Sequence, residues 1–264
     1  MIDRIDLDHV ALAADRMDDL WPRYAGDLAG VWAGAGVTPG FASAQVTFAN
    51  GMRLEALEPF EPERNDFLRR FLDRNGPGPH HLTFKVGDIR AALAEAEAAG
   101  YPPVSVDLRD PHWQEAFLHP KDALGIVVQL AQASGEGDWG SGPPDDLPRA
   151  RTSAPAVLQR VVHAVADLDQ GRRLFVDLLA GRVEDEGTDA GGTWVDLAWP
   201  GPGRVRLVQP ADAAVLEGRS GRLLHLAFAC TDPASVAGAV PRGDGRFEVP
   251  PDANLGTRLV LESA

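Results

Sequence analysis

The sequence predicts an α+β fold made of four βαβββ units, paired into two modules that each form a curved mixed sheet, or cup. Two observations lead to this prediction. The stretch Asp8–Ala13 resembles the stretch His80–Lys85, so the first half of the chain contains one unit twice. The same order begins again after residue 154, where His225–Cys230 resembles the strand of His81. Repeats that mix strands and helices suit paired sheets better than a solenoid.

Apolar periodicity predicts each element in order: alternation indicates a strand, and apolar residues three or four apart indicate a helix. Ile5–Ala13 alternates, and Met17–Leu28 has helical spacing. The other elements predicted in the first half are strands at Ala44–Phe48, Met52–Leu57, His81–Val86, Pro103–Leu108, Trp113–Leu118 and Gly125–Leu130, and a helix at Ile89–Ala99 that ends at Gly100.

Residues 133–154 are rich in Gly, Pro, Ser and acidic residues and lack apolar periodicity, which predicts a linker between a module at 1–132 and another at 155–264. The elements predicted after it are a strand at Gln159–Val165, a helix at Asp169–Leu179, and strands at Thr193–Ala198, Arg204–Val208, His225–Cys230 and Gly256–Leu261.

Composition limits the classes of function. A net charge of −14 argues against nucleic acid and anionic membranes as partners, because binding either needs cationic side chains. No stretch approaches the length of a membrane span, and the charged, alternating N-terminus does not resemble a secretory signal. A single cysteine, Cys230, allows no intramolecular disulfide. We therefore expect a soluble, cytoplasmic globular protein.

The repeats predict a metal site in the first module. His9 is followed 46 residues later by Glu55, and His81 is followed 48 residues later by Gln129. Each unit thus offers a histidine on its first strand and an oxygen ligand on its last, and two facing units would bring the four side chains to one point. Strand alternation places His80 on the opposite face from His81, so we assign the ligand to His81.

These segments resemble the vicinal-oxygen-chelate superfamily, which includes glyoxalase I, bleomycin-resistance proteins, extradiol dioxygenases and methylmalonyl-CoA epimerase. The first module is most similar to the epimerase and glyoxalase I branch. The resemblance rests on Asp8–Ala11, Leu54–Pro59, the run from Phe67 to Phe84, Phe117–Lys121 and Gly125–Leu130. It implies one divalent metal ion (Zn, Co, Ni, Mn or Fe), which stabilises an enolate or oxyanion, with proton transfer by a carboxylate beside the metal.

The chain departs from the epimerase pattern, which has an amide at the position of Glu55 and a carboxylate at that of Gln129. It also has no glutamate in residues 39–48, where that family places a second acid/base group. Glu55 is therefore the predicted catalytic residue, because a glutamine amide does not exchange protons near neutral pH.

The function expected from this resemblance is that of a metal-dependent isomerase, epimerase or glyoxalase-like lyase. Its substrate would be a small oxygenated metabolite, with a thioester as one candidate, and the protein would be either a monomer with pseudo-dimeric modules or a homodimer. One alternative is a metal-free binding or resistance protein. A third interpretation is a non-haem Fe(II) dioxygenase, since His9, His81 and Glu55 supply two histidines and one carboxylate.

The second module is predicted to be degenerate and to lack a metal site. Matching the strands places His163 at the position of His9, Arg206 at Glu55, His225 at His81 and Val260 at Gln129. Both oxygen ligands are thus replaced, because a guanidinium has no lone pair to donate and valine has no ligand atom. A structural role is one interpretation, and an anion site formed by His163, Arg206 and His225 is the other.

Overall fold

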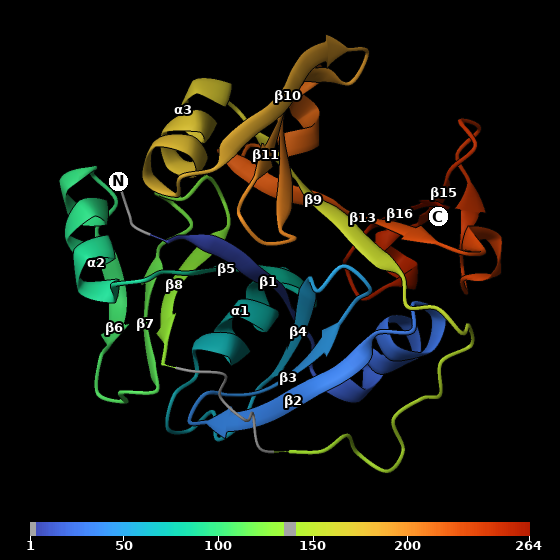
Figure 1. Ribbon diagram of the computed structural model, residues 1–264, viewed down its shortest axis with the longest axis horizontal. Coiled ribbons are helices and arrows are strands. Elements are labelled where there is room, and N and C mark those ends of the chain that lie inside the picture. Colours follow the sequence, from blue (N-terminus) through green and yellow to red (C-terminus); the bar gives the residue numbers. More distant parts are fainter. Residues whose placement is uncertain (1–3, 135–140) are drawn as a thin grey trace. The chain divides into compact units, whose positions relative to one another are not determined.

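The computed structural model describes residues 4–134 and 141–264 (Figure 1). The start of the N-terminal segment, residues 1–3, and residues 135–140 of the predicted linker lie outside the described residues. The chain forms two eight-stranded mixed sheets, one from each half, with few helices. The predicted α+β fold of two similar modules is therefore confirmed. The domain boundaries at 132 and 155 stay a prediction.

The first sheet has the strand order β2-β3-β4-β1-β5-β8-β7-β6, so the two units meet where β1 neighbours β5. Parallel pairing of β5 with β8 sets His81 opposite Val127 and Thr83 opposite Gln129. The strands are β1 (Asp6–Ala13), β2 (Val31–Thr38), β3 (Phe41–Thr47), β4 (Arg53–Glu58), β5 (Gly78–Lys85), β6 (Pro103–Asp107), β7 (Trp113–Leu118) and β8 (Val127–Ala133).

The second sheet repeats this order as β10-β11-β12-β9-β13-β16-β15-β14. Its strands are β9 (Val157–Val165), β10 (Arg182–Asp189), β11 (Gly192–Ala198), β12 (Arg204–Pro210), β13 (Gly221–Cys230), β14 (Val240–Pro241), β15 (Phe247–Val249) and β16 (Leu259–Ser263). The α-helices are α1 (Phe67–Asn75), α2 (Ile89–Ala98) and α3 (Leu168–Arg172).

The helix predicted at Met17–Leu28 is not one α-helix. A 3₁₀ turn at Met17–Asp19 precedes a π-helical segment at Pro22–Asp27, in which the Leu28 N–H reaches the Arg23 carbonyl. Pro22 lacks the N–H that a continuous α-helix would use at that point. A second π-helical segment, Arg173–Leu178, likewise continues α3.

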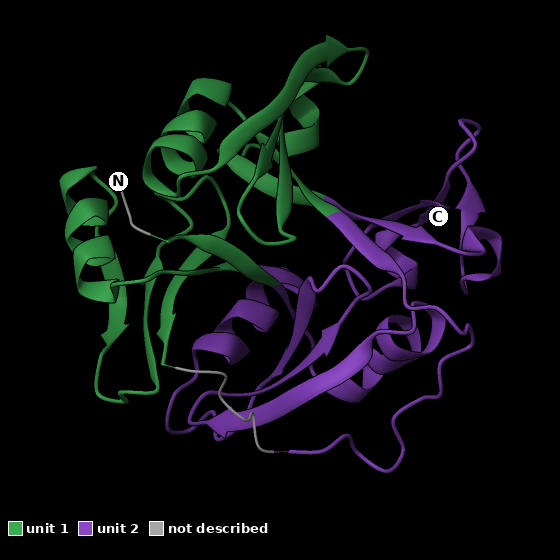
Figure 2. Cartoon of the chain, viewed as in Figure 1, with its two compact units in different colours: residues 1–9, 81–137, 160–224 green, residues 10–80, 138–159, 225–264 purple. Residues whose placement is uncertain are grey.

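The chain also separates into two compact units, and these do not coincide with the two sheets (Figure 2). Of the described residues, 4–9, 81–134 and 160–224 form one unit, and 10–80, 141–159 and 225–264 form the other. Each unit thus contains parts of both sheets. Within the first unit the Phe84 ring packs on Trp199, with centroids 5.2 Å apart, and within the second Phe48 packs on Phe228 at 4.9 Å.

Within the first compact unit, the backbone just before β8 lies close to the backbone at the start of β13. Gly125 has φ +81°, and a Cβ there would lie 1.8 Å from the Gly221 carbonyl oxygen, so this position requires glycine. Gly256, which precedes β16, makes the corresponding approach within the second unit: its φ is +76°, and a Cβ would lie 1.9 Å from the Pro77 carbonyl oxygen. The repeated sequence thus produces a repeated contact.

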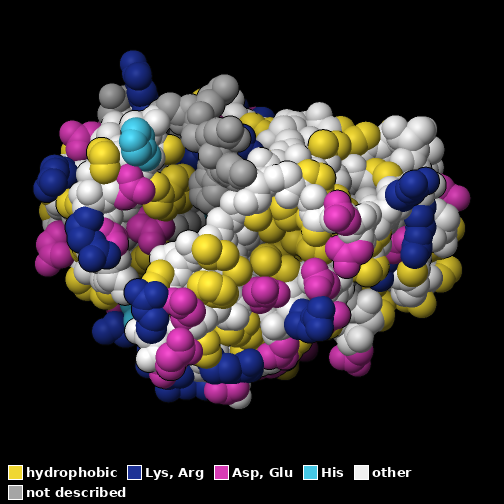
Figure 3. Space-filling view, turned by 90° about the horizontal axis from the view of Figure 1, so that it is seen from below, with side chains coloured by type: hydrophobic (Ala, Val, Ile, Leu, Met, Phe, Trp, Pro, Cys, Tyr) yellow, Lys and Arg dark blue, Asp and Glu magenta, His cyan; other side chains and the backbone are white. Residues whose placement is uncertain are grey.

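Charged side chains are distributed over the visible surface in Figure 3, with acidic and basic groups interspersed among apolar ones. No helix among the described residues combines the length and the apolarity needed to cross a bilayer.

Candidate metal centre

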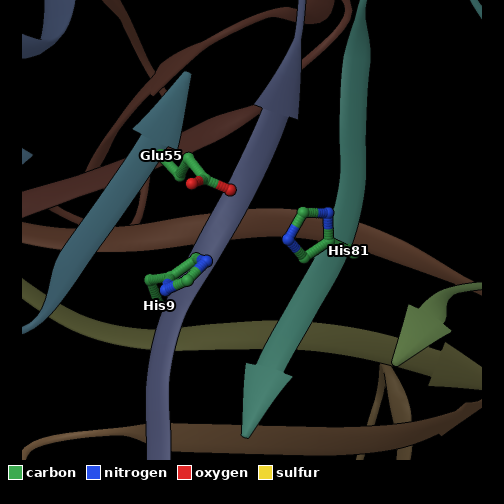
Figure 4. Close-up of side chains that lie close together, drawn as sticks. All are labelled: His9, Glu55 and His81. Carbon is green, nitrogen blue, oxygen red and sulfur yellow. The ribbon is translucent and has the colours of Figure 1, made fainter. Parts of the chain in front are cut away.

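Three side chains gather on neighbouring strands of the first sheet. His9 projects from β1, Glu55 from β4 and His81 from β5, and Figure 4 shows the three directed towards one another. A ring nitrogen of each histidine and a carboxylate oxygen of Glu55 all lie within 4.8 Å of one another. The side chains are buried, with exposed fractions of 1%, 5% and 5%. The fold therefore brings together three of the four residues that the sequence predicts as metal ligands.

His80 is directed elsewhere, as strand alternation predicts. Its ring packs on Phe71 and Phe67, residues of α1, with centroids 4.7 and 6.0 Å apart. Its neighbour His81 contacts His9 instead, at 5.7 Å between ring centroids and with an edge-on geometry. Thr83, two residues after His81 on β5, also contacts His9.

The donor set fits a divalent transition-metal ion. Two imidazole nitrogens and one carboxylate oxygen are ligands that zinc and its neighbours in the first transition row accept. Ligand atoms bound about 2.1 Å from one ion lie roughly 3 to 4 Å apart, so side-chain shifts of about 1 Å would bring this group into coordination. Because all three residues are buried, they would also exclude most water from the ion.

Asp8 orients His9. Its Oδ2 lies 2.8 Å from His9 Nδ1, and its Oδ1 lies 2.9 Å from Lys85 Nζ. Burial raises the pKa of Asp8, but the hydrogen bond and charge of His9, together with Lys85, outweigh burial and hold that pKa well below its usual range. A carboxylate on one ring nitrogen fixes the orientation of a metal-binding histidine and increases the basicity of the other nitrogen. Asp8 was not recognised in this role from the sequence.

The hydroxyl group of Thr83 links Gln129 to His9. Its Oε1 accepts a hydrogen bond from Thr83 Oγ1 at 2.5 Å, and that hydroxyl oxygen lies 2.8 Å from His9 Nε2. Its Nε2 donates to Glu115 Oε2 at 2.6 Å. Gln129 is 6% exposed, and Thr83 is fully buried. The role of Gln129 as a metal ligand stays a prediction, whereas its link to Glu115 is a feature that sequence reasoning missed.

Glu55 is held by an amide on the adjacent strand. Gln45, directly opposite it in the β3–β4 register, donates from Nε2 to Glu55 Oε1 at 3.3 Å. An amide thus occupies the region, residues 39–48, that lacks a glutamate. Gln45 cannot serve as a second base, but it can orient the carboxylate.

Strand register identifies the corresponding positions in the second sheet. The pairs Gln45–Glu55 and Thr83–Gln129 correspond to Asp196–Arg206 and Ala227–Val260. Arg206 donates two hydrogen bonds to Asp196, at 2.7 and 2.5 Å, and its guanidinium carbon lies 4.0 Å from the Trp194 ring centre.

His163 is fully buried, and its Nε2 donates to the Leu124 carbonyl oxygen at 2.9 Å. Together with the pairing of Arg206 with Asp196, this contact favours a structural role for the second module over an anion site.

Comparison with known proteins supports the first module's resemblance. The family model described as "Glyoxalase/Bleomycin resistance protein/Dioxygenase superfamily" matches residues 8–117. Mitochondrial methylmalonyl-CoA epimerase from Homo sapiens is 29% identical over 132 residues, which cover 48% of this chain and 73% of the human protein.

Among solved structures, a hypothetical protein from Staphylococcus aureus aligns with 99% of this chain and 100% of its own, with a TM-score of 0.60 at 12% identity. This alignment bears on the fold alone, and it covers both sheets. The methylmalonyl-CoA epimerase from Mycobacterium tuberculosis aligns with 50% of this chain and 89% of its own at 23% identity, with a TM-score of 0.45. Residues 8–117 are thus similar to the glyoxalase/bleomycin resistance protein/dioxygenase superfamily.

Proposed function

We propose that the first module binds one divalent metal ion through His9, Glu55 and His81, with Gln129 Oε1 as the fourth protein ligand. The observation that supports this proposal most directly is the gathering of three buried ligand-type side chains within 4.8 Å of one another, two of them histidines on equivalent strands of the repeat. Two imidazoles and one carboxylate also make up a ligand set that divalent transition-metal ions take in proteins.

We further propose that the module is a metal-dependent, single-base isomerase acting on a small oxygenated metabolite of the thioester class. The substrate class is suggested by the human relative, whose name specifies methylmalonyl-CoA, a thioester. A bound divalent ion would stabilise negative charge that develops on a substrate carbonyl oxygen.

Within this proposal, Glu55 takes the proton from the carbon beside the carbonyl group and delivers it to a neighbouring atom of the substrate, which needs only one base. Gln45 orients the Glu55 carboxylate, and Asp8 orients the His9 ring. Burial of Glu55 excludes water that would compete for the proton. Gln129, an amide, binds and does not transfer protons.

Metal analysis of the untagged full-length protein tests the binding proposal. We expect one equivalent of divalent metal in the purified protein and a loss of that metal in His81→Ala. His80→Ala is the matched control, because His80 is the adjacent buried histidine, packed against α1. Equal metal content in His81→Ala and the unaltered protein would contradict the assignment, as would a loss confined to His80→Ala.

Proton exchange tests the catalytic proposal. Incubation of methylmalonyl-CoA with the metal-loaded protein in D₂O should exchange the proton on the carbon between the two carbonyl groups, measured by NMR. Glu55→Gln should slow this exchange 10²- to 10⁴-fold, the usual contribution of a general base. The control is Glu58→Gln, at the end of the same strand, where Glu58 Oε2 accepts from the Met17 N–H at 2.8 Å. Full activity in Glu55→Gln would refute the role of Glu55.

A further inference from the structure

A chain of hydrogen bonds links His9 to a carboxylate on a more distant strand. His9 Nε2 lies 2.8 Å from Thr83 Oγ1, Thr83 donates to Gln129 Oε1 at 2.5 Å, and Gln129 Nε2 donates to Glu115 Oε2 at 2.6 Å. Three strands, β5, β8 and β7, contribute to the chain beyond His9. The carboxylate of Glu115 ends it.

Glu115 determines which end of the Gln129 amide faces the candidate metal centre. An amide can turn over and present either its oxygen or its NH₂ group, but an ionised carboxylate only accepts hydrogen bonds. The NH₂ group of Gln129 must therefore face Glu115. The amide oxygen is then directed to Thr83 and His9, and oxygen is the only atom of this amide that can coordinate a cation.

The structure also fixes Glu115. The Trp113 indole Nε1 donates to the same Oε2 at 2.7 Å, so two donors meet on one carboxylate oxygen. Glu115 is partly buried, which strengthens charge-assisted hydrogen bonds of this kind. The β7–β8 register places Glu115 opposite Ala131, two residues from Gln129, and long side chains can reach a diagonal neighbour of that kind.

The second sheet lacks the polar residues at the positions where the chain of hydrogen bonds runs. Ala227 and Val260 occupy the positions of Thr83 and Gln129 in the same parallel register. A network needed only to hold the sheet together would be expected in both modules. Its restriction to the module with the His9, Glu55 and His81 group connects it to that group.

We propose that Glu115 is a positioning residue of the metal centre: it holds the Gln129 amide with its oxygen towards His9 and Thr83. It also supplies, from the neighbouring strand, the negative charge that Gln129 itself does not have. This inference rests on the proposed function, since it assigns Glu115 to the same metal site.

Reciprocal exchange of the two side chains tests the proposal in the full-length protein. We would measure Co²⁺ affinity by isothermal titration calorimetry, and thermal unfolding without metal, for Glu115→Gln, Gln129→Glu and the double variant. Glu115→Gln should lower Co²⁺ affinity about 10-fold or more, the usual effect of losing a partner that orients a ligand. Gln129→Glu alone should lower the unfolding temperature of the metal-free protein, because it sets two carboxylates at hydrogen-bond distance.

The double variant restores an amide–carboxylate hydrogen bond with the two roles exchanged. Its Co²⁺ affinity should return at least to that of the unaltered protein, and its unfolding temperature should recover. Glu97→Gln, an equal change of charge at an exposed position on α2, is the control and should alter neither quantity.

Each result distinguishes this inference from the proposed function. If the unaltered protein binds no Co²⁺, both are overturned. If it binds Co²⁺ and Glu115→Gln binds equally well, only the positioning role is refuted, even where the unfolding temperature falls, because that pattern is the one a merely structural residue gives. A double variant that binds as weakly as Glu115→Gln would refute the positioning role as well.

Discussion

Acid should destabilise this protein through His163, the second-sheet counterpart of His9. The side chain is fully buried, its Nε2 donates to the Leu124 carbonyl oxygen, and its Nδ1 has no hydrogen-bond partner among the described residues. Burial lowers the pKa of His163 to about 4, and the hydrogen bond to Leu124 offsets part of that effect. His163 therefore stays neutral in the folded protein at pH values at which the unfolded chain already binds a proton.

The sign and size of the effect follow from linkage. The folded-state pKa of about 4 lies below the ordinary value of 6.5, so the stabilisation is fully present above pH 6.5 and is lost as the pH falls towards 4. At about 1.4 kcal/mol for each pH unit between these two values, the whole loss is about 3 kcal/mol. Between pH 7.5 and pH 5, about 2 kcal/mol of that loss should develop.

Comparison with His163→Gln isolates this contribution. Glutamine retains an N–H donor for the Leu124 carbonyl oxygen but does not titrate, while the other ionisable groups are shared and their effects cancel in the difference. Urea unfolding followed by the fluorescence of the six tryptophans gives the free energy of unfolding at each pH. The difference between the two proteins should shift by about 2 kcal/mol from pH 7.5 to pH 5. Parallel pH profiles would refute the reasoning.

Three further predictions concern the glycine contact, a buried ion pair and the second module. Gly125→Ala should lower the free energy of unfolding by more than the roughly 1 to 2 kcal/mol that a positive φ costs alanine. Gly100→Ala is the control: its φ is +86°, but an added Cβ would meet nothing within 4 Å, so it should cost only about that amount. Urea unfolding measures both. Asp27→Asn should cost about 3 to 5 kcal/mol, because Asp27 pairs with the buried Arg23 at 2.5 Å; a loss below 1 kcal/mol would contradict this. Metal titration of the full chain should saturate at one ion, and a second equivalent would refute a metal-free second module.

The sequence predicts those parts of the fold that repeat. Strands that carry His9 and His81 are short apolar runs with a polar residue at a matching position, and alternation correctly separates His81 from His80. The edge strands β2 and β10 were missed. β2 is rich in glycine and small residues and contains a register shift after Trp32. β10 is almost entirely exposed, and half of its residues are acidic. Neither strand therefore shows the periodicity of a half-buried strand.

The surroundings of the candidate centre depend on strand register, which a single sequence does not contain. Glu115 precedes Gln129 by 14 residues, and its strand sequence, Trp-Gln-Glu-Ala-Phe-Leu, does not mark it as a partner of Gln129. Only the antiparallel pairing of β7 with β8 brings the two side chains together. Thr83 similarly becomes significant only because β5 pairs with β8 in the register that sets it opposite Gln129. Each of these partners lies on the face that alternation predicts, but on a neighbouring strand.

The two sheets carry different residue pairs at the same register positions, and this difference is consistent with a metal-binding role for the first sheet and a structural role for the second. In the second sheet Asp196 and Arg206 satisfy each other's charge across β11 and β12, and stacking on Trp194 holds the guanidinium in place. In the first sheet the corresponding pair is an amide and a carboxylate, Gln45 and Glu55, and Gln45 donates a hydrogen bond to Glu55. A carboxylate beside two imidazoles offers ligand atoms to a cation, whereas a cation at the second site would meet the Arg206 guanidinium, which has no lone pair to donate. Arginine at the position of Glu55 and valine at that of Gln129 therefore remove both oxygen ligands from the second module, which is the basis for proposing that it packs and that the first module binds metal.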